Sequence, residues 1–241
     1  MNTLYTHTTP ITYYDLDYCG NVKLSALLKI VHIAADKNAS EIGIGFATLH
    51  PLNISFILQR FSLNISQMPK YGDTVTIRTW PADITRGTFV RKGDMYSNSG
   101  KKIMEWASLW ILFDLNARKI IKPSALPVEV PAIGDEGVGI EPQKIILPQD
   151  LGRTHHSYLH TVRYSDVDTN IHMNNSVYGD LVGNVLYSNT DTTINLQQVN
   201  INYLAETRMG EEISVNAYSV DNCNYIIGET SGRRAFTAMV K

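Results

Sequence analysis

Hydrophobic residues recur at intervals of three and four in two stretches of the chain. The first stretch carries Leu24, Leu27, Leu28, Val31, Ala34 and Ala35, and the second carries Val177, Leu181, Val182, Val185 and Leu186. This spacing is typical of a helix that buries one face. The sequence therefore predicts two core-facing helices, one in each half of the chain.

Strand patterns follow each predicted helix. Apolar and polar residues alternate in "DTVTIRTW" (73–80) and "EISVNAYSV" (212–220), and β-branched or aromatic residues dominate "KKIMEWASLWILFD" (101–114). Such patterns are typical of strands. In each half, a strand turns at Gly-Asp or Gly-Glu into another strand. A helix followed by antiparallel strands, twice, predicts an α+β fold.

The two halves share more than their predicted elements, because each opens with an Asp-x-Asp motif that follows an aromatic residue. Aligning the halves on this motif pairs three positions: Asp17 with Asp168, Cys19 with Asn170, and Asn21 with His172. Counting back from the glycine of each turn pairs Met68 with Glu206. The first half keeps only the aspartate of this polar set. A duplicated unit with its chemistry in the second copy is the simplest interpretation.

The segment between the halves is rich in Pro and Gly and has no helical period (122–150). We interpret it as a linker that runs along the surface. The predicted organisation is an N-terminal domain at 1–125, a linker at 126–152 and a C-terminal domain at 153–241.

Composition narrows the class of protein. The 241 residues are 44% hydrophobic and 18% charged, which is typical of a folded globular chain, and a net charge of -2 makes nucleic acid a poor default partner. Cys19 and Cys223 lack the spacing of a zinc site or a disulfide framework. The most apolar window, 107–113, is shorter than the roughly 20 residues of a membrane-spanning helix. No secretory or transit pattern is visible at the N-terminus. We expect a cytoplasmic protein with no metal, no cofactor and no membrane insertion.

The polar set of the second half suits carbonyl chemistry. If 162–168 is extended and a helix begins near Asn174 or Asn175, the preceding residues lie beside unpaired helix N–H groups. An acyl carbonyl bound there would find donors in the Asn170 amide and in His172. A carboxylate, Asp168 or Glu206, would then activate the attacking water.

Structural roles compete with this interpretation. Polar residues before a helix are most often capping and turn residues, and a lone Glu206 on a strand usually faces solvent. His155, His156 and His160 are better explained as surface or core histidines than as metal ligands. The chain has no G-x-S-x-G elbow and no P-loop, and "GIGFAT" at 43–48 breaks the dinucleotide fingerprint.

The segment "RYSDVDTNIHMNNSVY" (163–178) resembles the catalytic segment of acyl-acyl carrier protein (acyl-ACP) thioesterases, whose pattern is R-x-S-D-x-D-x-N-x-H-x-N-N-x-x-Y. The first half resembles the N-terminal domain of this family through "DLDYCGNVKLSALLKIVHIAADKNA", "ILQRFSLNISQMPKYGDTVTIRTWP" and "GTFVRKGDMYSNSGKKIMEWASLWILFD". The resemblance implies two tandem hotdog domains, each a long helix wrapped by an antiparallel sheet. It also implies hydrolysis of fatty acyl-ACP to free fatty acid, which ends chain elongation, in a bacterial member.

Four catalytic residues follow from this resemblance. Asp168, Asn170 and His172 match the family's D-x-N-x-H, and Glu206 in "NYLAET" matches its downstream glutamate. Some members carry a cysteine after that glutamate, whereas this chain has Thr207, so water attack is the simpler mechanism. Which carboxylate is the base stays open.

Substrate contacts are expected mainly in the N-terminal domain, which lines the acyl pocket in this family. The candidate substrate-binding residues are Leu27, Val31, Ile54, Phe56, Asn174 and Asn175. Ordinary core packing is the competing role for the four apolar residues, and capping is the competing role for the two asparagines.

Acyl carrier protein is acidic, so a local basic patch is expected to receive it. The candidates are Arg86, Arg91, Lys92, Lys101, Lys102 and Arg163. Hotdog proteins commonly associate, which makes a homodimer plausible. Three alternatives remain: the same chemistry on acyl-coenzyme A, a hotdog dehydratase, and a noncatalytic acyl-carrier or lipid-binding protein.

Overall fold

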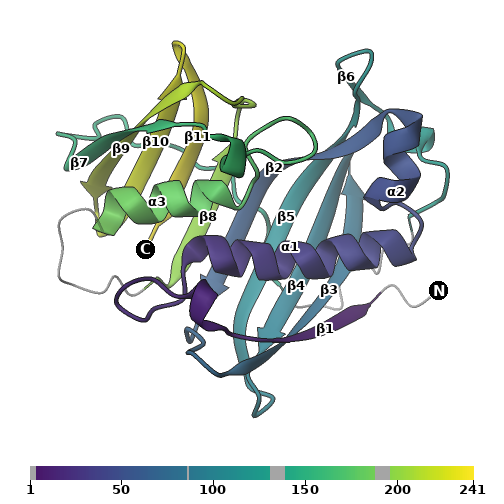
Figure 1. The fold of residues 1–241 in the computed structure, drawn as a ribbon, viewed down its shortest axis with the longest axis horizontal. Coiled ribbons are helices and arrows are strands. Elements are labelled where there is room, and N and C mark those ends of the chain that lie inside the picture. The colour runs from purple at the N-terminus through teal and green to yellow at the C-terminus, as the bar shows by residue number, and fades with distance from the viewer. Residues whose placement is uncertain (1–3, 86, 131–138, 188–195) are drawn as a thin grey trace. The chain divides into compact units, whose positions relative to one another are not determined.

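The computed structural model describes residues 4–85, 87–130, 139–187 and 196–241. The chain divides into two compact units. The first comprises 1–12 and 30–142, and the second comprises 13–29 and 143–241. Each unit contains an antiparallel sheet and a helix (Figure 1), as the α+β prediction requires.

The first unit is built on a strongly curved sheet with the strand order β1-β3-β4-β5-β2, and β6 pairs with β5. Its strands are β1 (Tyr5–Pro10), β2 (Ile54–Ile65), β3 (Thr74–Thr85), β4 (Thr88–Tyr96), β5 (Lys102–Asp114) and β6 (Lys119–Ile121). Its helical elements are α1 (Leu24–Glu41, from Ile30 on), α2 (Phe46–Leu49), η2 (His50–Leu52) and η3 (Pro123–Ala125). The two segments predicted as strands in this half, 73–80 and 101–114, lie in β3 and β5 except for their first residues.

The core of the first unit lies between α1 and the inner face of its sheet. Val31 and Ala34 of the predicted helix stripe are fully buried. Phe61 of β2 stacks on Trp106 of β5, with ring centroids 5.9 Å apart. Burial of each large apolar side chain contributes about 1.5–3 kcal/mol. The three- and four-residue spacing thus identified the buried face of α1 correctly.

The second unit has the strand order β8-β11-β10-β9-β7. Its strands are β7 (His156–Thr161), β8 (Gln198–Tyr203), β9 (Glu212–Val220), β10 (Cys223–Thr230) and β11 (Arg233–Val240). Its helical elements are η1 (Tyr13–Asp15), α1 up to Lys29, η4 (Tyr164–Asp166) and α3 (Val177–Tyr187). The strand predicted at 212–220 coincides with β9.

Within the second unit, the first turns of α1 pack tightly on α3. A Cβ atom at Gly179 would lie 2.8 Å from the Ser25 backbone nitrogen, so only glycine fits this crossing. Beside it, the Ser25 hydroxyl donates a hydrogen bond to the Asp180 carboxylate. Two helix backbones approach this closely only where one of them lacks a side chain.

The described parts of the predicted linker are tied to the sheets by polar contacts. In the first unit, Lys92 Nζ lies 2.6 Å from Glu141 Oε1. In the second, the Asn202 amide accepts a hydrogen bond from the Ile145 backbone N–H and donates one to the Gln143 carbonyl. The boundaries expected at 125 and 153 stay a prediction.

Candidate functional site

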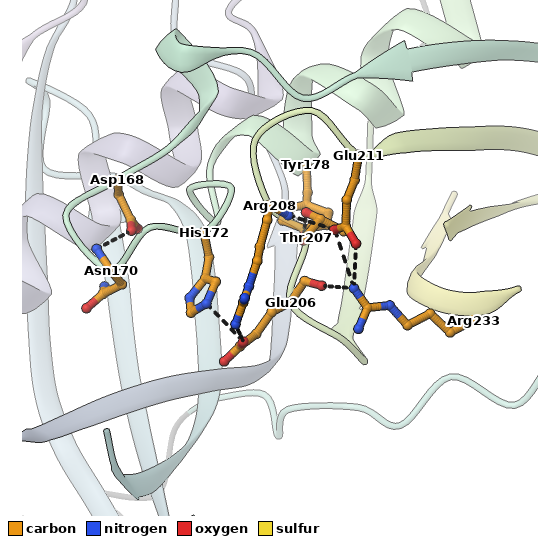
Figure 2. Close-up of polar contacts among 9 residues, drawn as sticks. All are labelled: Asp168, Asn170, His172, Tyr178, Glu206, Thr207, Arg208, Glu211 and Arg233. Carbon is orange, nitrogen blue, oxygen red and sulfur yellow. Dashed lines mark hydrogen bonds and ion pairs between the residues drawn. The ribbon is translucent and has the colours of Figure 1, made fainter. Parts of the chain in front are cut away.

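The predicted catalytic loop is a short hairpin in the second unit. Val167 and Met173 form an isolated antiparallel bridge, and the Asp168 N–H donates to the His172 carbonyl at 3.0 Å. The Asp168 carboxylate accepts a hydrogen bond from the Asn170 backbone N–H at 2.8 Å (Figure 2). This Asp therefore fixes the turn that presents Asn170 and His172.

Two assumptions about the backbone around this loop are wrong. Segment 162–168 is not extended throughout, because the 3-10 turn η4 interrupts it, and α3 begins at Val177 rather than near Asn174 or Asn175. Asn174 Oδ1 instead accepts hydrogen bonds from the Ser176 backbone N–H and hydroxyl, at 2.9 and 2.7 Å. The turn formed by these bonds delays the helix, so Asn170 and His172 do not directly precede its first turn.

His172 and Glu206 are brought together from segments far apart in the sequence. His172 Nε2 lies 2.9 Å from Glu206 Oε2, and the two side chains are 19% and 27% exposed (Figure 2). Arg208 Nη2 is 3.8 Å from the same carboxylate oxygen. A carboxylate paired with an imidazole, partly shielded from water, is a competent acceptor of a proton from a bound water.

The segment around Glu206 is held by further contacts, of which those of Tyr178 and Arg233 are drawn in Figure 2. The Met173 N–H donates to the carbonyl of the fully buried Thr207 at 2.8 Å, which joins the Glu206 segment to the hairpin. The Tyr178 hydroxyl lies 3.1 Å from Thr207 Oγ1. The Arg233 guanidinium donates to the Glu206 carbonyl at 2.9 Å and pairs with Glu211 at 3.0 Å.

Sequence reasoning missed these supporting residues. Burial raises the pKa of Tyr178 to about 12, so this phenol stays neutral and keeps its hydrogen bond to Thr207. Tyr178 is the last residue of the family pattern matched at 163–178, and this position in the pattern could have identified it from the sequence. Arg233 and Glu211 have no local signal, because their pairing depends on the register of β11 and the turn before β9.

Backbone strain marks the centre of the hairpin. Ile171 has φ 65°, in the left-handed region that β-branched residues rarely adopt, and its side chain is exposed. Such a conformation is unfavourable by about 1–3 kcal/mol and is typically found at functional sites. The strained residue lies between Asn170 and His172, two of the predicted catalytic residues.

The predicted substrate-binding residues occupy different environments. Leu27 and Val31 are fully buried in the helix stripe. Ile54 and Phe56 pack against an apolar cluster of the first unit, composed of Ile42, Ile44, Leu49, Phe89, Leu112 and Val130. The Asn174 side chain caps a turn, and the Asn175 carbonyl accepts a hydrogen bond from the Tyr203 hydroxyl at 3.2 Å.

A cavity of about 360 Å³ adjoins this apolar cluster of the first unit. Its walls are formed by Ile84, Phe89, Pro123, Ser124, Leu126, Pro127, Val128, Glu129 and Val130. Phe89 links the cavity to Phe56, because their rings meet edge to face at 5.0 Å. The size and apolar lining suit a small hydrophobic ligand.

The expected basic docking patch is partly wrong. Arg91 is only 8% exposed and Lys92 only 4%, so neither can contact a docked protein. Arg86 lies outside the described residues. Lys101 and Arg163 are exposed, and Lys102 pairs with Glu105 at 3.0 Å.

The described residues contain neither a candidate metal site nor a candidate membrane-spanning helix. Across 4–85, 87–130, 139–187 and 196–241, no group of three or more histidines, cysteines or carboxylates could hold a metal ion. In the same part of the chain, no helix is long and apolar enough to cross a membrane.

Comparison with known proteins identifies the family. The acyl-ACP thioesterase N-terminal domain matches residues 2–127, and the acyl-ACP thioesterase C-terminal domain matches residues 151–237. The chain belongs to the acyl-ACP thioesterase family. It is 22% identical over 219 residues to a dodecanoyl-[acyl-carrier-protein] hydrolase of Cinnamomum camphora, covering 86% of this chain and 57% of that relative. An acyl-[acyl-carrier-protein] hydrolase of Cuphea viscosissima is 25% identical over 157 residues, covering 63% and 37%.

Solved structures agree with the fold of this family member. An acyl-ACP thioesterase from Bacteroides thetaiotaomicron superposes with a TM-score of 0.85 at 24% identity, covering 99% of this chain and 97% of the other. The 12:0-ACP thioesterase of Umbellularia californica gives a TM-score of 0.82 at 16% identity, covering 100% and 97%. The predicted α+β architecture with two tandem hotdog domains is thereby confirmed.

Proposed function

We propose that this family member hydrolyses the thioester of a fatty acyl-ACP with water, releasing a free fatty acid and the carrier protein. Family membership supports the reaction class. The observation that carries the proposal is the 2.9 Å contact between His172 Nε2 and Glu206 Oε2, beside a D-x-N-x-H hairpin. The chain spans 57% of the first plant relative, so substrate and partner rest on this proposal.

Glu206 is the better candidate for the base. The Asp168 carboxylate already accepts the Asn170 backbone N–H in a tight turn, whereas the Glu206 carboxylate is paired with an imidazole that can share or relay a proton. In the proposed step, water oxygen bonds to the acyl carbon while its proton passes to the Glu206–His172 pair. The Asn170 amide stabilises the carbonyl oxygen as it becomes negative. The carbon–sulfur bond then breaks, and the proton passes to the departing sulfur.

The first unit is the proposed holder of the acyl chain. Its apolar cluster and the adjoining cavity of about 360 Å³ offer space for hydrocarbon. An acidic acyl carrier protein is the proposed partner, and exposed cations such as Lys101 and Arg163 are the remaining candidates for its docking patch. Cytoplasmic localisation and a homodimer stay predictions.

The test is hydrolysis of acyl-ACPs of increasing chain length, followed as release of free fatty acid. Wild type is expected to turn over at least one of them, and His172→Ala is expected to lose this activity. His160→Ala is the matched control, because His160 Nε2 also pairs with a carboxylate, that of Asp166, at 3.0 Å and with similar exposure.

Three results would contradict the proposal. Equal loss of activity in His160→Ala and His172→Ala would remove the site assignment. A higher kcat/KM for acyl-coenzyme A than for the matching acyl-ACP would move the substrate to coenzyme A, and tight binding without turnover would indicate a noncatalytic carrier-binding protein.

A further inference from the structure

A positively charged side chain lies inside the first unit, under α1. The Arg91 guanidinium donates to Asn38 Oδ1 of α1 at 2.7 Å and to Thr79 Oγ1 of β3 at 3.3 Å. Both partners are neutral, and among the described residues no carboxylate pairs with Arg91. Buried arginines are rarely found without an anionic partner, because burying an unpaired charge is costly.

Arg91 stays positively charged at neutral pH although it is buried. Burial lowers the pKa of Arg91 to about 10, which is still well above neutrality. The two neutral acceptors occupy one nitrogen, Nη1, of a group that offers five donor hydrogens. Among the residues that the structure describes, Arg91 therefore provides this interior with a positive charge whose donors are not all used.

Two more polar groups of this interior lack partners. His32 Nε2 and Trp106 Nε1 are both buried and make no hydrogen bond to any residue that the structure describes. Trp106 of β5 pairs with Gly93, two residues after Arg91 on β4, and therefore shares its face of the sheet. We name Arg91, His32 and Trp106 the inner polar seam.

Contacts within the unit join the parts of this seam. The His32 ring lies 6.1 Å from the Trp110 ring, and Trp110 Nε1 donates to the Ser108 hydroxyl at 2.8 Å. Ser108 in turn contacts the Arg91 carbonyl at 3.4 Å. Phe89, two residues before Arg91 on β4, lines the cavity of about 360 Å³ and faces the same side of the strand. Phe89 is therefore the residue of β4 that connects the wall of the apolar cavity to the strand face that carries Arg91.

We propose that the first unit binds acyl groups that carry an oxygen acceptor, a carboxylate or a ketone, which is recognised by Arg91 and its seam. The inference rests on the proposed acyl thioester substrate and deepens it by naming the acyl class. A plain hydrocarbon would leave His32 Nε2 and Trp106 Nε1 without partners and would place apolar atoms against the remaining Arg91 donors, whereas an oxygen acceptor takes hydrogen bonds from Arg91 and Trp106. Sites that hydrogen-bond a substrate oxygen discriminate strongly against analogues that lack it.

The experiment compares three acyl-ACPs of equal chain length, at the length that the hydrolysis series selects. One carries a plain acyl chain, one ends in a carboxylate and one carries a ketone next to its end. Wild type is expected to show a kcat/KM at least about 10-fold higher for an oxygenated chain than for the plain one. The carboxylate and ketone arms distinguish recognition by charge from recognition by hydrogen bonding alone.

Arg91→Met is expected to abolish this preference while retaining the volume of the side chain. The matched control is Arg78→Met on β3, where Arg78 lies over the Tyr96 ring at 5.6 Å, on the other face of the sheet from Thr79. Arg78→Met is expected to keep the preference. Melting temperatures of both variants separate loss of folding from loss of recognition.

The inference is overturned if wild type prefers the plain chain, or if Arg91→Met retains the preference of wild type. A merely structural Arg91, tying α1 to the sheet, would change the rates of all three substrates by one common factor. Thioether analogues of the three acyl-ACPs give binding constants without hydrolysis. If nothing is hydrolysed but the oxygenated thioether binds in an Arg91-dependent way, the hydrolase proposal fails while this inference stands.

Discussion

Two hairpin loops of the second unit have the same backbone and different side chains. In both, an Asp N–H donates across the loop: Asp17 to the Asn21 carbonyl at 2.8 Å, and Asp168 to the His172 carbonyl at 3.0 Å. In both, the Asp carboxylate also accepts the N–H two residues later. The aspartate makes the same backbone contacts in both loops, so the proposed chemistry of the second copy depends on the other side chains.

The same equivalence extends to the turns that follow. Gly72 N–H donates to the Ile11 carbonyl at 3.0 Å, and Gly210 N–H donates to the Val162 carbonyl at 2.9 Å. This register places Met68 of the first copy opposite Glu206. The two copies are similar scaffolds, and the second has the imidazole and carboxylate pair of His172 and Glu206 where the first has Asn21 and Met68.

The largest effect on kcat/KM is expected when equivalent positions of the two loops are substituted. His172→Ala is expected to lower kcat/KM for acyl-ACP by about 10²–10⁴-fold, the range typical of a lost acid–base group. Asn21→Ala is expected to leave kcat/KM within about threefold, because Asn21 contributes its backbone carbonyl to the loop. Steady-state kinetics with both variants decide the matter. Comparable losses would mean that the two loops are not functionally distinct.

A second comparison separates the two carboxylates. Glu206→Gln keeps the shape but removes the proposed base, so kcat is expected to fall by about 10²-fold or more with little change in melting temperature. Asp168→Asn weakens the bond to the Asn170 N–H, so unfolding free energy is expected to fall by about 1 kcal/mol. The measurements are kcat and urea unfolding on both variants. A larger kcat loss without destabilisation in Asp168→Asn would make Asp168 the base.

At one pair of equivalent positions in the two helices, α1 carries His32 and α3 carries Gly183. Burial lowers the pKa of His32 from 6.5 to about 4. The unfolded chain therefore takes up a proton near pH 6.5 while the folded protein does not, so stability falls as pH drops from about 6.5 to about 4. Between pH 7 and 5 this loss amounts to about 2 kcal/mol. Urea unfolding should show that His32→Phe loses correspondingly less stability than wild type, and equal losses would contradict the prediction.

Two glycines of α3 provide the next test. Gly179→Ala is expected to destabilise the protein by about 1–3 kcal/mol, because the new methyl group would clash with the Ser25 backbone. Gly183→Ala meets nothing within 4 Å and is expected to stabilise by about 0.5–1 kcal/mol. Thermal unfolding of both variants checks the opposite signs. A destabilised Gly183→Ala would show that its space is needed.

Sequence patterns predicted the features that depend on local spacing. The helix stripe, strands β3, β5 and β9, and the register of the two halves all follow from periodicity and repeats. The burial of Arg91 and Lys92 did not, because charged residues normally indicate an exposed strand. Their burial depends on Asn38 and Glu141, each about fifty residues away in the sequence. The hydrogen bond from Arg233 to the Glu206 carbonyl could not be predicted from the sequence either, since only the fold brings the two residues together.

The smallest effect, on the unfolding free energy, is expected at the left-handed position that the two loops share. Gly20 has φ 83° and Ile171 has φ 65°, so the first loop uses the residue suited to this conformation and the second does not. Ile171→Asn is expected to raise the unfolding free energy by about 1 kcal/mol, because asparagine tolerates the left-handed region, and Gly20→Ile is expected to lower it by a similar amount. Urea unfolding measures both changes, and kcat/KM of Ile171→Asn shows whether the exposed isoleucine serves substrate turnover. A more stable but slower variant would mean that the second loop retains strain for function, whereas unchanged stability in both variants would remove the strain argument.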